Sequence, residues 1–259
     1  SWRIPFLVSF VLGFFGLCLR LQIVDSLFLT QKIKQNTQNL APLKELLTKH
    51  YQIILFAIPY LAGCTISLYF VLTYIPSYLQ HINVKNEYYF KITIIGTFFN
   101  CIGSPIIGYI ARYINVYKIM IFGFLISLFC NIPIMILITL NSSLANSMLT
   151  IILYFPVIII STLSSPTIVL LFPKYIRYTG IAFVSNISIC IFGGTTPFIC
   201  WLSIKITDWY IAPALYVSFM ALISLIAVIC YKSKILAIIN IDEDKTQEIN
   251  INKNLILGK

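Results

Sequence analysis

Hydrogen-bonding side chains recur at helical spacing between residues 92 and 111. Thr93, Thr97, Asn100 and Ser104 follow one another at intervals of four, three and four residues. Residues spaced in this way lie on one face of a helix, so their side chains form a polar stripe. Such a stripe can line a wet cavity and hydrogen-bond a small solute, and Thr97 and Asn100 are the candidates for that role. Ser104 and Gly108 also fit a small-residue ridge that packs against another helix, which is the alternative.

Tyr60, Ser67 and Tyr74 form a second aligned set, at intervals of seven residues. An aromatic face attracts a quaternary ammonium ion through the ring quadrupole, so the set is a candidate contact for such a solute. The chain has 16 Tyr and 19 Phe, however, and tyrosines near helix ends are typical of the membrane interface. A purely structural role is therefore the alternative.

The stretch FGGTTP, Phe192–Pro197, interrupts a long apolar run. Two glycines and a proline weaken the backbone hydrogen-bond ladder there, and freed carbonyls are tolerated only beside protein or a wet cavity. Gly193, Gly194, Thr196 and Asn186 are candidates for a bendable helix that contributes to a central site. Close helix contact at the two glycines is the alternative. Ser161, Thr162, Ser164 and Ser165 precede Pro166 in another run, where they are predicted to hydrogen-bond to their own helix.

The apolar runs hold no Asp, Glu, Lys, Arg or His at their centres, and His50 and His81 both lie at edges. Because intramembrane ionisable groups mark proton relays, this chain is predicted not to carry proton coupling alone. Its seven cysteines form no CxxC pair, which predicts no metal site. Phosphate-binding glycine motifs and Ser/His pairings are also missing, so no cofactor and no enzymatic activity are expected.

Composition indicates that lipid surrounds these candidate residues. The chain of 259 residues is 59% hydrophobic and 10% charged, whereas a soluble domain has about 25% charged residues. Runs near the spanning length of about 20 residues recur, and the alternation of barrel strands is missing. The predicted fold is an all-α membrane protein with about seven transmembrane helices. The runs are Ile4–Leu21, Tyr51–Leu79, Ile92–Ala111, Ile119–Leu140, Met148–Phe172, Ile181–Ile204 and Ala212–Tyr231.

The net charge of +10 is distributed unevenly over the connections between these runs. Of the lysines and arginines, eleven lie on one set of alternate connections, four on the other and three far down the tail. The richer set includes Arg112, Lys174 and Arg177. Because basic residues accumulate in cytoplasmic loops, the N-terminus is predicted outside and the tail in the cytoplasm. The charge is thus assigned to topology, and no nucleic acid is expected as a partner.

The order of the runs predicts four segments. Residues 1–21 form one span, 22–50 a polar cytoplasmic connection, 51–231 a bundle of six helices and 232–259 a cytoplasmic tail. Transporters built from two six-helix halves have a long cytoplasmic connection between their sixth and seventh spans. We therefore expect residues 1–21 to be the last helix of an otherwise missing N-terminal bundle, which would be a partner of this chain.

Three stretches resemble the metabolite–proton symporters of the major facilitator superfamily. SWRIPFLVSFVLGFFGLCLRLQI, at residues 1–23, is similar to their sixth span. LYFVLTYIPSYLQHI, Leu68–Ile82, looks like the seventh span of the proline/betaine branch, and FPKYIRYTGIAFVSNISICIFGGTTPFI, Phe172–Ile199, resembles the hairpin and helix of spans ten and eleven. The resemblance implies the sixth helix plus the C-terminal bundle of a transporter with twelve spans. It also accounts for Lys174 and Arg177, because the family has a basic turn at that hairpin.

One motif departs from the family pattern. After the eighth span the family usually has Gly-x-x-x-Asp-Arg-x-Gly-Arg-Arg, whereas this chain has GYIARYINVYK from Gly108 to Lys118. Arg112 occupies the acidic position and Asn115 the position of the second glycine. The acid normally anchors a charge relay at the cytoplasmic gate, so the departure bears on gating.

The resemblance implies a proton-coupled symporter for a small osmolyte such as proline or glycine betaine, which works by alternating access in a bacterial inner membrane. Two alternatives stay open. One is an inactive half-transporter from a split reading frame, which the altered gate motif favours. The other is a symporter for organic acids of the 2-oxoglutarate, citrate or shikimate type. A dianion needs a buried cation, and the spans offer none, so a zwitterionic solute fits better.

Overall fold

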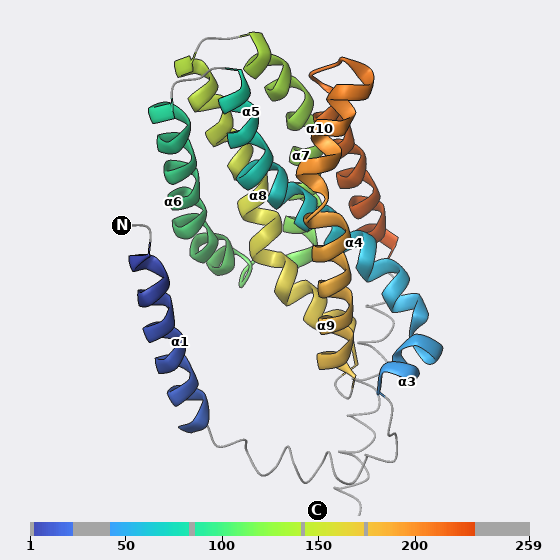
Figure 1. The fold of residues 1–259 in the computed structure, drawn as a ribbon. Coiled ribbons are helices and arrows are strands. Elements are labelled where there is room, and N and C mark those ends of the chain that lie inside the picture. The colour runs from blue at the N-terminus through green and yellow to red at the C-terminus, as the bar shows by residue number, and fades with distance from the viewer. Residues whose placement is uncertain (1–2, 23–41, 83–85, 141–142, 174–175, 231–259) are drawn as a thin grey trace, which may run out of the picture. The chain divides into compact units, whose positions relative to one another are not determined.

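The computed structural model describes residues 3–22, 42–82, 86–140, 143–173 and 176–230. All regular elements within these ranges are helical, as the composition predicted (Figure 1). The helices are α1 (Ile4–Gln22), α3 (Pro42–Lys49), α4 (Tyr51–Tyr69), α5 (Ile75–His81), α6 (Asn86–Ile110), α7 (Val116–Leu140), α8 (Ser143–Leu171), α9 (Arg177–Ile187), α10 (Thr196–Thr207) and a last helix, Ala212–Cys230. Two π-helices, η1 (Phe70–Tyr74) and η2 (Ser188–Gly193), join α4 to α5 and α9 to α10.

The chain divides into two compact units, Ser1–Glu45 and Leu46–Lys259. The first contains α1, with an apolar stretch from Leu7 to Leu19 whose described side chains are largely exposed. Within the second unit, six helical segments are long and apolar enough to cross a membrane. They are Tyr51–His81, Thr93–Ile110, Val116–Thr139, Thr150–Leu171, Arg177–Thr207 and Ala212–Cys230. These segments match the six runs predicted for the bundle. The tail and most of the predicted connection 22–50 lie outside the described residues.

Helices α4 and α8 form the centre of the bundle. α8 packs against α6, α7 and α4, and α4 in turn packs against α9 and η2. In the spans of α4 and α8, 56% of the most apolar window is buried, compared with 6% in the span of α6. α6 lies at one edge of the bundle (Figure 1) and leaves most of its surface uncovered by described residues.

Both π-helices lie just before a proline. Proline has no amide hydrogen for the carbonyl four residues earlier, so the ladder is interrupted at that carbonyl. For Pro76 this carbonyl belongs to Leu72 in η1, and for Pro197 it belongs to Gly193 in η2. The ladder shifts to bonds that span five residues, such as Gly194 N to Ile189 O at 2.8 Å. π-turns of this kind are frequent at functional sites.

A glycine allows the last helix to approach α4. A Cβ atom at Gly63 would overlap the Ser224 hydroxyl and lie 2.7 Å from the Ser224 Cβ. The same hydroxyl lies 2.8 Å from the carbonyl oxygen of Pro59 in α4 and 2.8 Å from that of Met220 in its own helix, and it shares its hydrogen between them. A small residue and an interhelical hydrogen bond thus fix this contact, as is common between helices in a membrane.

Candidate functional site

A cavity of about 360 Å³ lies where α4, α8 and α9 meet. Its wall contains six hydroxyl-bearing side chains, and the rest of its lining is apolar. The hydroxyl-bearing residues are Thr65 and Tyr69 from α4, Ser161, Ser164 and Ser165 from α8, and Ser185 from α9. The remaining lining residues are Leu61, Cys64, Leu68, Ile168, Val169, Ile181 and Ile189. An apolar pocket with a few polar groups is the usual form of a small-molecule site.

Three of these hydroxyls already donate their only hydrogen to backbone carbonyls. Ser164 Oγ donates to the carbonyl of Ser161 at 2.8 Å, and Ser161 Oγ donates to the carbonyl of Ile158 at 3.4 Å. Thr65 Oγ1 lies 3.0 Å from the carbonyl oxygen of Ala62 and 3.3 Å from that of Ser188. These hydroxyls retain only lone pairs for a ligand, so each can act there as an acceptor.

The aromatic ring of Tyr69 is part of the cavity wall, and Gly193 of η2 makes room for it. A Cβ at Gly193 would lie 3.1 Å from Cε2 and 3.2 Å from Cδ2 of Tyr69, and 3.3 Å from Cβ of Thr65. These separations are shorter than ordinary carbon contacts of about 3.5 to 4.0 Å. Because the buried Gly193 has no side chain, the Tyr69 ring and Thr65 can occupy this space.

Hydrogen bonds fix η2 against α4 beside the cavity. Besides the bond from Thr65 to the carbonyl of Ser188, the Ser188 hydroxyl donates to the carbonyl of Ile58 at 3.4 Å. The two bonds run in opposite directions between the same two elements. The π-helix that follows Asn186 is thus part of the wall rather than a loose connection.

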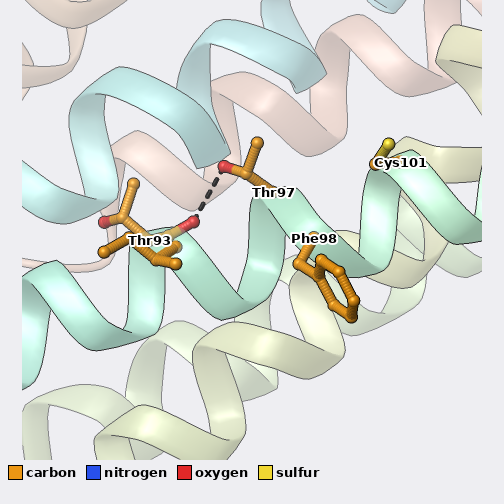
Figure 2. A pocket seen from close by; sticks show the side chains of 5 residues that line it. Thr93, Thr97, Phe98 and Cys101 are labelled. Carbon is orange, nitrogen blue, oxygen red and sulfur yellow. Dashed lines mark hydrogen bonds between the residues drawn. The ribbon is translucent and has the colours of Figure 1, made fainter.

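A second hollow, of about 420 Å³, lies on one face of α6 and involves that helix alone (Figure 2). Its lining is Thr93, Ile94, Thr97, Phe98 and Cys101. Thr97 Oγ1 donates to the carbonyl of Thr93 at 2.8 Å, so its hydrogen is also used within the helix. The hollow has one wall, and enclosing a solute there requires a second body.

The predicted polar stripe on α6 is present as a face of the helix, but much of its hydrogen bonding is internal. Ser104 Oγ lies 2.8 Å from the carbonyl oxygen and 3.2 Å from Oδ1 of Asn100. Gly108 is exposed, and a Cβ there would have nothing within 4 Å. The described residues therefore provide no partner helix for a ridge at Gly108.

Tyr60, Ser67 and Tyr74 lie in the core of the bundle, and none of them lines the cavity between α4, α8 and α9. All three are buried, and their hydroxyls have no hydrogen-bond partner among the described residues. The Tyr74 ring stacks on Phe70 with centroids 5.3 Å apart and meets Trp201 edge-on at 5.8 Å. In this conformation the three side chains pack within the bundle.

The other candidate residues, between α9 and the start of α10, lie around η2. Asn186 is exposed and donates from Nδ2 to the carbonyl of Ala182 at 2.8 Å. Gly194 is exposed at the end of η2, and the buried Thr196 donates to the carbonyl of Phe192 at 2.6 Å. None of these candidates is a lining residue of the cavity, and Gly193 lies against Tyr69 and Thr65, which do line it.

Comparison with known proteins identifies the family. The family model described as Major Facilitator Superfamily matches residues 1–197 of the chain. The chain belongs to the Major Facilitator Superfamily. It is accordingly a multi-pass membrane protein with the helical fold of that superfamily.

The similar curated proteins are named as transporters of proline and betaine. The proline/betaine transporter of Salmonella typhimurium is 29% identical over 244 residues, which cover 90% of this chain and 48% of that protein. The glycine betaine/proline/ectoine/pipecolic acid transporter OusA of Dickeya dadantii is 28% identical over 238 residues, or 87% of this chain and 47% of OusA. The chain thus spans about half the length of the curated relatives it matches. No solved structure matches the chain at a significant level.

In this superfamily member, Arg177 closes the hairpin between α8 and α9. Its Nε donates to the carbonyl of Phe172 at 3.2 Å, just beyond the end of α8 at Leu171. A cation at this position complements the negative end of the helix dipole. Gly180 lets the Phe172 ring pack across the turn, because a Cβ there would lie 2.5 Å from Cδ1 of the ring. Lys174 lies outside the described residues.

The residues of the altered superfamily motif form the turn between α6 and α7. Arg112 is exposed in this turn. Asn115 caps α7: its Oδ1 accepts from the amide of Tyr117 at 2.9 Å, and its carbonyl accepts from the amide of Lys118 at 2.9 Å. Asparagine is a strong N-cap residue, so there is a local structural reason for Asn115 at the position where the family has glycine.

The sequence did not single out most of the cavity wall. Ser161 and Ser164 hydrogen-bond to their own helix, as predicted, and they also line the cavity. The signal that could have found them is the spacing of Ser161, Ser164 and Ser165, which places three small polar residues on one face of α8. Ser185 and Tyr69 carry no comparable signal, because only the packing of α4 against α9 brings them to this cavity.

Proposed function

We propose that this chain is the C-terminal half of a secondary transporter for a small zwitterionic osmolyte, such as proline or glycine betaine. The cavity between α4, α8 and α9 is its share of the substrate site. The observation that carries the proposal is the wall itself, which combines six hydroxyl-bearing residues with apolar side chains and contains no charged residue. A solute without net charge suits such a wall.

The surroundings of the cavity support alternating access. One wall comes from α4, which continues into η1, and another from α9, which continues into η2. A π-turn weakens regular helix geometry at a defined point, so helices broken in this way can bend beside a bound solute. The names of the relatives point to the same solutes.

The organic-acid alternative fits the cavity less well. A buried dianion requires paired cations or several strong donors, because transfer of a charge out of water is costly. The lining contains no Lys, Arg or His, and three of its hydroxyls can no longer donate. An organic acid would depend entirely on groups outside this cavity.

The missing half is proposed as the partner, in a bacterial inner membrane, with the proton as coupling ion. The relatives are about twice as long as the matched region, which leaves room for a bundle of this size. The described span centres of this chain hold no carboxylate, so a coupling carboxylate would belong to that half. An inactive half-transporter remains a second candidate, favoured by Arg112 at the position of the gate acid.

Uptake of labelled solute tests the proposal. The chain is expressed alone, and separately together with five upstream spans taken from its own locus or from a relative, in bacteria that lack osmolyte transporters. We expect labelled proline or glycine betaine to accumulate only in the second strain and a protonophore to abolish it. No uptake in either strain would favour the inactive half, and uptake of citrate but not betaine would favour the organic-acid alternative.

A further inference from the structure

We propose that the cavity between α4, α8 and α9 holds the cationic end of the zwitterion, and that the carboxylate is bound outside it. The inference rests on the proposed function and adds to it the orientation of the solute. Its ligand class is an alkylated ammonium group.

The first step is the supply of hydrogens on the wall. Three lining hydroxyls donate their hydrogens to backbone carbonyls, namely those of Thr65, Ser161 and Ser164. Toward a ligand they present partially negative oxygens, which repel a carboxylate and attract a cation. The side-chain hydroxyls of Ser165, Ser185 and Tyr69 make no hydrogen bond within the part of the chain that the structure describes, and three neutral hydroxyls are a weak donor set for a buried carboxylate.

The second step is the ring of Tyr69. An aromatic ring attracts an ammonium ion within about 6 Å of its centroid, and desolvation strengthens the attraction. The ring belongs to the wall and is seated against Gly193. The apolar neighbours Leu68 and Ile189 also line the cavity and suit the methyl groups of a quaternary ammonium.

The third step is the absence of a counter-charge for an anion. None of the lining residues, all of which the structure describes, is basic. A carboxylate placed here would be both unpaired and short of donors, whereas the cationic end needs only the ring and the oxygen lone pairs. The carboxylate must then lie toward the open side of the site, where the partner half supplies its contacts.

Competition among three probes tests this orientation. The assembled transporter, in nanodiscs, binds labelled glycine betaine in competition with choline or with 3,3-dimethylbutyrate. Choline has the quaternary ammonium without the carboxylate, and 3,3-dimethylbutyrate replaces the charged nitrogen of betaine by carbon while keeping its shape and carboxylate. We expect choline to compete at least tenfold better than 3,3-dimethylbutyrate.

Substitution at Tyr69 ties this preference to the cavity. Tyr69→Leu should weaken betaine and choline about three- to thirtyfold and leave 3,3-dimethylbutyrate within twofold, whereas Tyr69→Phe, which keeps the ring, should bind all three nearly as the wild type does. Gly193→Ala moves the ring by a few tenths of an ångström and should weaken the two cations to a smaller extent. Phe129→Leu, at a position on α7 that is 70% exposed and remote in sequence from the cavity lining, is the matched control for loss of an aromatic ring and should change nothing.

The outcomes separate the two proposals. Betaine binding that is unaffected by Tyr69→Leu, or a loss that is equal for choline and 3,3-dimethylbutyrate, would overturn the orientation and leave the proposed function standing. If the assembled wild type transports another solute and binds no betaine, both fail. A variant counts only if it elutes as the wild-type complex does in size-exclusion chromatography, and Gly193→Ala supplies the second test where Tyr69→Leu does not assemble.

Discussion

Glycines in this chain have opposite roles that depend on the neighbours a Cβ would meet. At Gly63 the last helix passes so close that Ser224 occupies the space of a side chain, whereas at Gly108 the space is empty. The sequence does not separate these two cases, since both glycines lie inside apolar helices. Only the packing partners decide which glycine is required.

Gly63→Ala should therefore destabilise the bundle. Overpacking in a filled core costs about 1 to 3 kcal/mol, and here the added methyl would also displace the Ser224 hydroxyl from the Pro59 carbonyl. Thermal unfolding in detergent, followed by loss of the monodisperse peak, measures the effect. Gly108→Ala is the control and should be neutral or stabilising by up to about 1 kcal/mol, because alanine favours a helix.

A compensating variant makes this prediction sharper. Gly63→Ala combined with Ser224→Gly removes the overlapping atoms, so it should recover part of the lost stability. If Gly63→Ala melts at the wild-type temperature, the close approach of the last helix to α4 is wrong.

The helices show how far hydropathy and local sequence signals reach. The six spans of the bundle were predictable from run length, because lipid demands long apolar helices. The interruption at FGGTTP was predictable too, since Pro197 has no amide hydrogen to donate to the Gly193 carbonyl. The structure has η2 there. The side of each helix that faces a cavity was not predictable. Tyr60 and Tyr74 have the sequence spacing of a single helix face but are buried in the core, whereas Tyr69, which lies between them in sequence, lines the cavity.

The hairpin between α8 and α9 depends on a single side chain that caps a helix. Arg177→Met removes the hydrogen bond to the Phe172 carbonyl, which is worth about 0.5 to 1.5 kcal/mol. Hydrogen exchange at the start of α9, including the Gly180 amide bonded to Ile176, should become several-fold faster. Arg112→Met, at an exposed position in another turn, is the matched control and should leave this exchange unchanged. Equal protection in both variants would contradict the capping role.

The bundle as a whole has one span that its own helices barely cover. The most apolar window of α6 is 6% buried, and its hollow at Thr93, Thr97 and Cys101 has no opposite wall within the described residues (Figure 2). Relatives about twice as long as the match suggest a candidate cover, namely the N-terminal half that is proposed above as the partner and is called the missing half here. On α7, the large apolar side chain of Phe129 is 70% exposed and suits lipid.

Assembly should therefore protect Cys101 from a thiol reagent. In a variant that keeps Cys101 as its only cysteine, N-ethylmaleimide should react with the chain alone in detergent and at least fivefold more slowly after assembly with the missing half, because the hollow is then covered. Phe129→Cys in a chain without its seven native cysteines is the matched control, and its rate should not change, since lipid or detergent surrounds it in both states. Cys200 is completely buried and gives the unreactive baseline. If Cys101 and Phe129→Cys keep the same ratio of rates before and after assembly, α6 faces lipid and the missing half docks elsewhere. The polar face of α6 would then have no role in the transport site, which would have to be completed at α4 and α9 alone.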